Sequence, residues 1–148
     1  MEMNLKHARH AVGQSAYHFV CRPKCNVSVF RSDFARMVIE DALWEVARRH
    51  KINIIEMKVM PNHVHCFAEI PSTISVSMAL QYLKGGSARL FFKKCTVWHS
   101  FYSKRGTIKP HLWSPGKFYR SVGSVTSEVV ERYIRDSQES WSYKEKNW

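Results

Sequence analysis

Two β-rich segments joined by a tight turn constrain the fold of this chain most. Residues 52–60 and 63–70 are rich in β-branched and other apolar side chains, and Pro61 and Asn62 stand between them. Two such segments separated by two turn residues are typical of an antiparallel hairpin. Alternate residues of the second segment are apolar and should face a core: Val64, Cys66, Ala68 and Ile70.

Two further strands are expected outside this hairpin. Residues 15–21 predict a first strand, which should end before Pro23 because proline cannot donate to a strand ladder. Residues 117–122 predict a last strand that ends at Gly123. Residues 97–116, which precede it, show no clear period and are expected to be irregular.

Helices are expected between these strands. Ser32 is a suitable N-cap for a helix that reaches about residue 50, and a second helix should run from about Ser75 to residue 94. Gly85 and Gly86 interrupt the second helix and predict a bend or a close approach by a ligand. The apolar stripe of the first helix would consist of Phe34, Val38, Ile39, Ala42, Leu43 and Val46.

A last helix should begin at Ser124 or Thr126 and reach about residue 141. The element order is then β-α-β-β-α-β-α. This order predicts an α+β fold with the ferredoxin-like split β-α-β plan and an added C-terminal helix. Such a fold carries its helices on one face of an antiparallel sheet and leaves the other face open for a site. The length of 148 residues supports one domain over residues 1–148.

The expected cellular location follows from the apolar runs, the N-terminal residues and the cysteine spacing of the sequence. No apolar run approaches the ~20 residues that cross a bilayer, and residues 1–7 lack the apolar block of a signal peptide. The four cysteines have no Cys-x-x-Cys spacing. We therefore expect a cytoplasmic protein with free thiols and no membrane partner.

The charge of the chain is strongly segregated. The formal net charge is +11, and no Asp or Glu occurs between Glu69 and Glu128. An acid-free basic segment attracts polyanions, so nucleic acid is the expected partner, although a merely solvated basic surface is the alternative. The residues expected to contact phosphates are Lys24, Lys84, Arg89, Lys93, Lys94 and Arg120.

The second hairpin strand begins with a possible metal-binding pair, His63 and His65. Residues two apart on a strand share a face, and these two lie ~6.6 Å apart along the backbone. Two imidazoles can therefore converge on one ion. An isolated His-x-His is more often a pair of surface histidines, and a metal site needs a third nitrogen or oxygen donor.

Tyr133, on the expected last helix, is a candidate nucleophile at the edge of that helix's apolar stripe. By itself it would more often be a half-buried packing residue. A phenol with a pKa near ~10 is a poor nucleophile, but a divalent cation on the scissile phosphate would make its attack feasible. The ester so formed conserves the bond energy, so a 3′-hydroxyl can reseal the strand later.

The chain resembles the single-tyrosine HUH transposases of small prokaryotic insertion sequences, where HUH denotes His–hydrophobe–His. The resemblance extends over nearly the whole chain, and its five blocks occur in the correct order. They are YHFVCRPK at 17–24, EMKVMPNHVH at 56–65, LKGGSARL at 83–90, LW at 112–113 with Phe118 and VG at 122–123, and SEV at 127–129 with RYI at 132–134.

The resemblance implies a specific activity. His63 and His65 would bind Mg²⁺ or Mn²⁺, and Tyr133 would form a 5′-phosphotyrosine link and leave a free 3′-hydroxyl. The substrate would be single-stranded DNA with hairpin ends. The protein would act as a homodimer in which the tyrosine helix serves its own subunit or its partner.

The third metal ligand departs from the family pattern. The family usually has Gln four residues after the tyrosine, where this chain has Ser137, and Gln138 follows one residue later. A helix irregularity that turns Gln138 inward is the preferred interpretation, substitution by Asp136 is the second, and an impaired site is the third.

Three rival functions remain at this point. A rolling-circle replication initiator or relaxase would share the chemistry, but the short chain and the C-terminal tyrosine favour a transposase. A non-catalytic nucleic-acid-binding module with the same sheet would present stacking aromatic residues on its open face. An inactive relative is the third, given the shifted glutamine.

Overall fold

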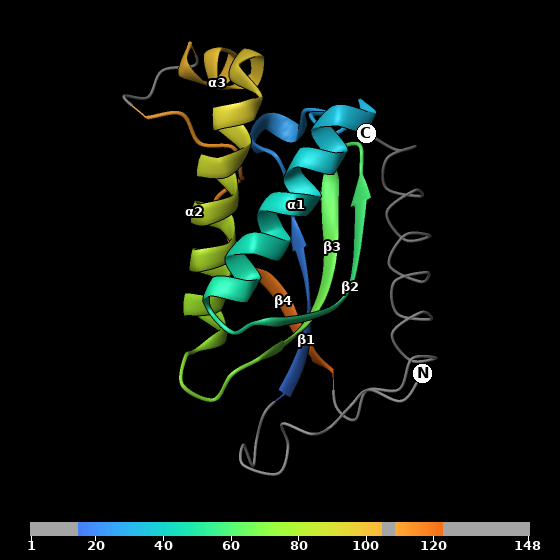
Figure 1. Ribbon diagram of the computed structural model, residues 1–148, viewed down its shortest axis with the longest axis vertical. Coiled ribbons are helices and arrows are strands. Elements are labelled where there is room, and N and C mark those ends of the chain that lie inside the picture. The colour runs from blue at the N-terminus through green and yellow to red at the C-terminus, as the bar shows by residue number, and fades with distance from the viewer. Residues whose placement is uncertain (1–14, 105–108, 123–148) are drawn as a thin grey trace.

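The computed structural model of the chain describes residues 15–104 and 109–122 (Figure 1). Its strands are β1 (Ser15–Cys21), β2 (Asn53–Met60), β3 (His63–Ile70) and β4 (Phe118–Val122). Its helices are α1 (Asp33–Arg49), α2 (Val76–Lys94) and α3 (Thr96–Ser103), with a short 3-10 helix, η2, at Lys24–Asn26. The expected C-terminal helix and its caps lie outside the described residues.

The four strands form one antiparallel sheet in the order β2-β3-β1-β4. Two β-α-β crossovers interleaved in this way give the ferredoxin-like arrangement, so the predicted α+β fold is confirmed. Helices α1 and α2 lie side by side on one face of the sheet (Figure 1). The expected hairpin is present, and its turn at Pro61 and Asn62 brings Met60 opposite His63.

Both long helices begin where the sequence predicts. The hydroxyl of Ser32 accepts a hydrogen bond from the backbone of Ala35 at 3.1 Å, and that of Ser75 accepts one from Met78 at 3.0 Å. Each cap satisfies a backbone donor that the first helical turn would otherwise leave without a partner, which contributes about 1 kcal/mol.

One residue of the expected α1 stripe is misplaced. The side chain of Phe34 is 56% exposed, whereas the other predicted members are buried. Each four-residue step turns the side chain by about 40° around a helix, so a row extended back from Val46 gradually leaves the buried side. The buried stripe therefore continues from Val38 to Ala35 and does not include Phe34.

The glycine pair of α2 does not bend the helix, which runs unbroken from Val76 to Lys94. Gly86 instead allows α1 to approach, since a Cβ atom there would lie 2.7 Å from Cγ2 of Val46. A Cβ on Gly85 would meet no atom within 4 Å. The close contact at Gly86 is therefore made by the neighbouring helix, and the expected approach of a ligand stays a prediction.

The segment expected to be irregular contains a helix, α3. Trp98, Phe101 and Tyr102 stand at helical spacing and pack against the core, and the Tyr102 hydroxyl donates to the carbonyl of Lys24 at 2.9 Å. Three aromatic residues at i, i+3 and i+4 are the signal that the prediction overlooked. Residues 109–117 then lead to β4 without regular structure, apart from a bridge between Trp113 and Pro23.

The four cysteines are free thiols, as predicted, and three of them are buried. None of the helices formed by residues 15–104 and 109–122 has the length and apolar character needed to cross a membrane.

Replacement of Gly86 by Ala should destabilise the protein. The new methyl group would overlap the branched side chain of Val46, and the strain should exceed the gain in helix propensity, for a net loss of about 1–2 kcal/mol in the free energy of unfolding. Gly85→Ala is the matched control and should be neutral or stabilising by up to about 1 kcal/mol. Urea denaturation of both variants checks this, and equal effects would contradict the proposed helix contact.

Candidate metal site and basic groove

His63 and His65 share one face of β3 and meet there. Alternation places Val64 and Cys66 in the core beneath the helices, so the two imidazoles lie on the opposite face. Their Nε2 atoms are 3.0 Å apart, and their rings are nearly perpendicular, at 84°. The predicted convergence of the two side chains is present.

This part of the sheet is not open, contrary to the expectation. All eight residues of β3 are buried, and His65 is completely inaccessible. The strand lies between β1 and β2, and the ring of His18 on β1 stacks on both His65 and Phe67, with centroids 5.3 and 5.9 Å away. The flanking strands and this aromatic contact explain part of the burial.

His18 is the site residue that sequence reasoning missed. Its Nε2 atom lies 3.2 Å from Nδ1 of His65. The contact follows from strand register, because Val20 pairs with His65 and His18 pairs with Phe67 on the same face. His63 also has a partner, since its Nδ1 lies 2.8 Å from Oδ1 of Asn62 in the hairpin turn.

The three imidazoles are held in their neutral form. Burial lowers the pKa of His63 to about 4, and the nearby Arg22 adds to the effect. Burial also lowers the pKa of His65 to about 4, with contributions from His63, Lys58 and Arg22. The pKa of His18 falls to about 4 mainly because of burial. Neutral imidazole is the form that binds a metal ion.

The two facing nitrogens fit a divalent ion. Ligand atoms about 2.1 Å from an octahedral ion are about 3.0 Å from their nearest neighbours, which matches the Nε2 separation. Over the described ranges, no group of three His, Cys, Asp or Glu side chains is arranged to hold an ion. The other predicted site residues, Tyr133, Asp136 and Gln138, lie outside those ranges.

A basic groove lies along α2, on the helical side of the sheet. It has a volume of about 1040 Å³ and lies between α2 and residues 109–117. Four of the six predicted DNA contacts line it: Lys24, Lys84, Arg89 and Lys93. Its other cationic residues are Lys109 and Lys117, and its floor is apolar, with Ala88, Phe92, Leu112 and Trp113. No acidic side chain lines it, because acids in the described part of the chain occur only on α1, β2 and β3.

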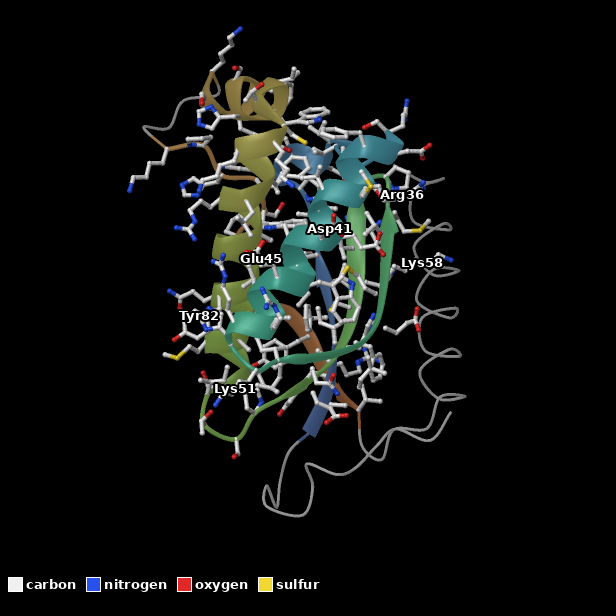
Figure 2. All side chains as sticks on the ribbon, viewed as in Figure 1. Arg36, Asp41, Glu45, Lys51, Lys58 and Tyr82 are labelled. Atoms are coloured by element: carbon white, nitrogen blue, oxygen red, sulfur yellow. The ribbon has the colours of Figure 1, made fainter. Side chains whose placement is uncertain are left out.

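Figure 2 shows two of these acids, Asp41 and Glu45, along α1. That helix also carries exposed ion pairs, in which Asp33 contacts Arg36 and Glu45 contacts Arg49, each at 2.5 Å. The charges on α1 are therefore partly balanced by neighbouring residues. The described cations that line the groove along α2 have no acidic residue among the groove's lining residues.

Lys84 differs from the other cations of the groove. Its ammonium group donates to the carbonyls of Ser114 and Gly116, both at 2.7 Å, and burial lowers its pKa. It therefore fixes residues 114–116 against α2. Trp113 is anchored nearby, because its indole donates to the hydroxyl of Ser87 at 3.0 Å. Its side chain is buried and belongs to the hydrophobic core.

The remaining two predicted contacts lie outside the groove. Lys94 is exposed at the end of α2. Arg120 is exposed on β4 opposite His18, on the same face of the sheet as the histidines.

The buried imidazoles should make stability depend on pH. Unfolded histidines take up protons below about pH 6.5, whereas the folded ones resist protonation down to about pH 4. The contribution of these histidines to the free energy of unfolding is therefore complete above pH 6.5 and should fall as the pH is lowered towards 4. Melting temperatures of His65→Phe should fall less steeply over this range than those of the wild type. An unchanged slope in His65→Phe would contradict the assignment.

The comparisons with known proteins all point to one protein family. Residues 11–137 match the model of the family described as "Transposase IS200 like". The transposase for insertion sequence element IS200 from Salmonella typhimurium is 27% identical over 138 residues, which cover 93% of this chain and 84% of the relative. The ISDra2 transposase TnpA from Deinococcus radiodurans is 25% identical over 144 residues, covering 94% and 95%.

Solved structures agree on the fold. A protein from Deinococcus radiodurans described as a transposase superposes with a TM-score of 0.65 at 22% identity, over 92% of this chain and 97% of its own. A REP-associated tyrosine transposase bound to a REP hairpin superposes with a TM-score of 0.56 at 16% identity, over 86% and 70%. Because the family model spans most of the chain, this protein belongs to the IS200-like transposases.

Proposed function

We propose that this transposase is metal-dependent and acts on single-stranded DNA, which it cleaves and rejoins through a 5′-phosphotyrosine intermediate. The observation that carries the proposal is the pair of buried, neutral imidazoles whose Nε2 atoms face each other at 3.0 Å. A rolling-circle replication initiator would use similar chemistry, but the family match favours transposition.

Each site residue has a role in this proposal. His63 and His65 hold Mg²⁺ or Mn²⁺, and Gln138 or Asp136 supplies a further donor. When bound, the ion neutralises charge that develops on the scissile phosphate. The phenol oxygen of Tyr133 loses its proton and attacks phosphorus, and the bond from phosphorus to the 3′-oxygen breaks. The 3′-oxygen takes up a proton and leaves as a hydroxyl, and attack by a 3′-hydroxyl on the phosphotyrosine reverses these steps.

The proposed partner is single-stranded DNA with hairpin ends. The REP-associated relative is bound to a hairpin, which supports this substrate class for a chain of the same fold. A homodimer is also proposed, in which the helix that carries Tyr133 serves its own subunit or the partner. One domain over residues 1–148 is consistent with a family match that extends from residue 11 to residue 137.

The groove along α2 is the proposed path of the DNA backbone. Lys24, Arg89 and Lys93 line it, and no acid among residues 15–104 and 109–122 does so, which leaves these cations able to neutralise successive phosphates. Lys84 acts indirectly by holding residues 114–116, which form one wall. Lys94 and Arg120 lie beyond the groove and would contact phosphates outside it.

The chemistry can be tested by trapping the covalent intermediate. A pool of hairpin-ended single strands with randomised flanks, incubated with the protein and Mn²⁺, should give a protein–DNA adduct on a denaturing gel. Tyr133→Phe should give none, because it lacks the attacking oxygen, and a chelator should abolish the adduct of the wild type. Tyr119→Phe, which alters an exposed tyrosine of β4, is the matched control and should keep the adduct.

Binding by the wild type without an adduct in any metal would instead identify a non-catalytic binding module or an inactive relative. An adduct that persists in Tyr133→Phe would show that another residue is the nucleophile.

The groove can be tested through the salt dependence of binding. Each phosphate contact on a single strand contributes about 0.7 to the slope of log affinity against log salt concentration. Arg89→Gln and Lys93→Gln should therefore each lower affinity and reduce that slope by about 0.7. Arg48→Gln removes the same charge from an exposed position on α1 and should change the slope little. Equal effects of all three variants would indicate that only net charge matters.

A further inference from the structure

Each of the two facing histidines has a partner on the other nitrogen of its ring. Nδ1 of His63 lies 2.8 Å from Oδ1 of Asn62, and Nδ1 of His65 lies 3.2 Å from Nε2 of His18. An imidazole bound through Nε2 must carry its hydrogen on Nδ1, so these partners decide whether Nε2 is available as a ligand.

Asn62 determines which ring nitrogen of His63 carries the hydrogen. Its amide nitrogen points to Oδ1 of Asn26 at 3.4 Å, which directs its own oxygen towards His63. A carbonyl oxygen only accepts hydrogen bonds, so Nδ1 of His63 must be the donor. In neutral His63 the lone pair is then on Nε2, the atom that faces His65.

His18 is close enough to His65 to determine its tautomer in the same way. The two rings are within 12° of parallel, and the ring nitrogen of His18 can either donate to or accept from Nδ1 of His65. If His18 accepts, His65 carries its hydrogen on Nδ1 and offers a second lone pair from Nε2. If His18 donates, the Nε2 hydrogen of His65 points at Nε2 of His63.

We propose that His18 and Asn62 are positioning residues that set the tautomers of His65 and His63, so that both Nε2 lone pairs are directed to one divalent cation. This inference rests on the proposed metal-dependent function. Without the cation, His18 donates to His65, which in turn donates to His63. With the cation, the hydrogens of His65 and His18 both move from Nε2 to Nδ1 by exchange with solvent, and the number of protons is unchanged.

His18 itself is not a metal ligand in this arrangement. Its Nε2 atom faces Nδ1 of His65, whereas the proposed ion lies at Nε2 of that ring. It acts through His65, as Asn62 acts through His63. Loss of such an outer partner typically weakens metal binding by about 10–100-fold.

The test is Mn²⁺ binding by the full chain without DNA, measured by calorimetry and by electron paramagnetic resonance. His18→Phe keeps a ring but removes the acceptor, and Asn62→Leu removes the acceptor next to His63. Both should weaken Mn²⁺ binding by about 10–100-fold. Asn62→Asp keeps an acceptor oxygen next to His63, now on a carboxylate, and should therefore restore the Mn²⁺ binding that Asn62→Leu loses. His50→Phe, which alters a histidine stacked on Tyr82 in the region between α1 and α2, is the matched control and should bind as the wild type does.

Nuclear magnetic resonance gives a second readout that needs no variant. The ¹⁵N shifts of the wild-type imidazoles, recorded with and without saturating Mg²⁺, should show the hydrogen of His65 on Nδ1 only when the ion is bound. The role of His18 would be overturned if Nδ1 of His65 carried no hydrogen when the metal ion is bound. It would also be overturned if folded His18→Phe bound Mn²⁺ with wild-type affinity. Wild-type affinity in Asn62→Leu would overturn that of Asn62. If the wild type bound no divalent ion at all, the proposed metal-dependent function would fail together with this inference.

Discussion

The contact between the Nε2 atoms of His63 and His65 is the constraint on which the site depends. Two polar rings buried at 3.0 Å are stable only if the nitrogens are matched, either by a hydrogen between them or by a cation that both can bind. Burial excludes the charged imidazolium, so the match must come from tautomers. The hairpin turn supplies Asn62 and β1 supplies His18. The contact therefore depends on the pairing of β3 with both β1 and β2.

The strands, both long helices and the shared face of the two histidines could be predicted because each follows from a local pattern. Period-two alternation defines β3, and Ser32 and Ser75 mark the starts of α1 and α2. His18 could not be found in this way, since it is 47 residues from His65 and only the pairing of β1 with β3 brings them together. The burial of β3 was missed for the same reason, because a strand's position within the sheet is not visible in its own sequence.

The cations show a second limit of sequence reasoning. Lys84, Arg89 and Lys93 stand on one helix in an acid-free segment, and nothing in that pattern separates them. In the fold, Lys84 is turned towards the carbonyls of Ser114 and Gly116. Its bonds depend on a segment 30 residues away, so its structural role appears only when that segment is in place. The roles of Tyr133, Asp136 and Gln138 remain predictions from the sequence.

The separation of the groove from the histidines bears on the kind of DNA that can serve both. The groove lies along α2, while His63 and His65 lie on the sheet face opposite α1 and α2. A strand in contact with both must pass from one side of the sheet to the other, and at the β4 edge Arg120 is exposed on the histidine side while Lys117 lines the groove. Duplex DNA, with a persistence length of about 50 nm, strongly resists such a turn over the thickness of one small sheet. A single strand is far more flexible, so this layout favours the single-stranded substrate proposed above.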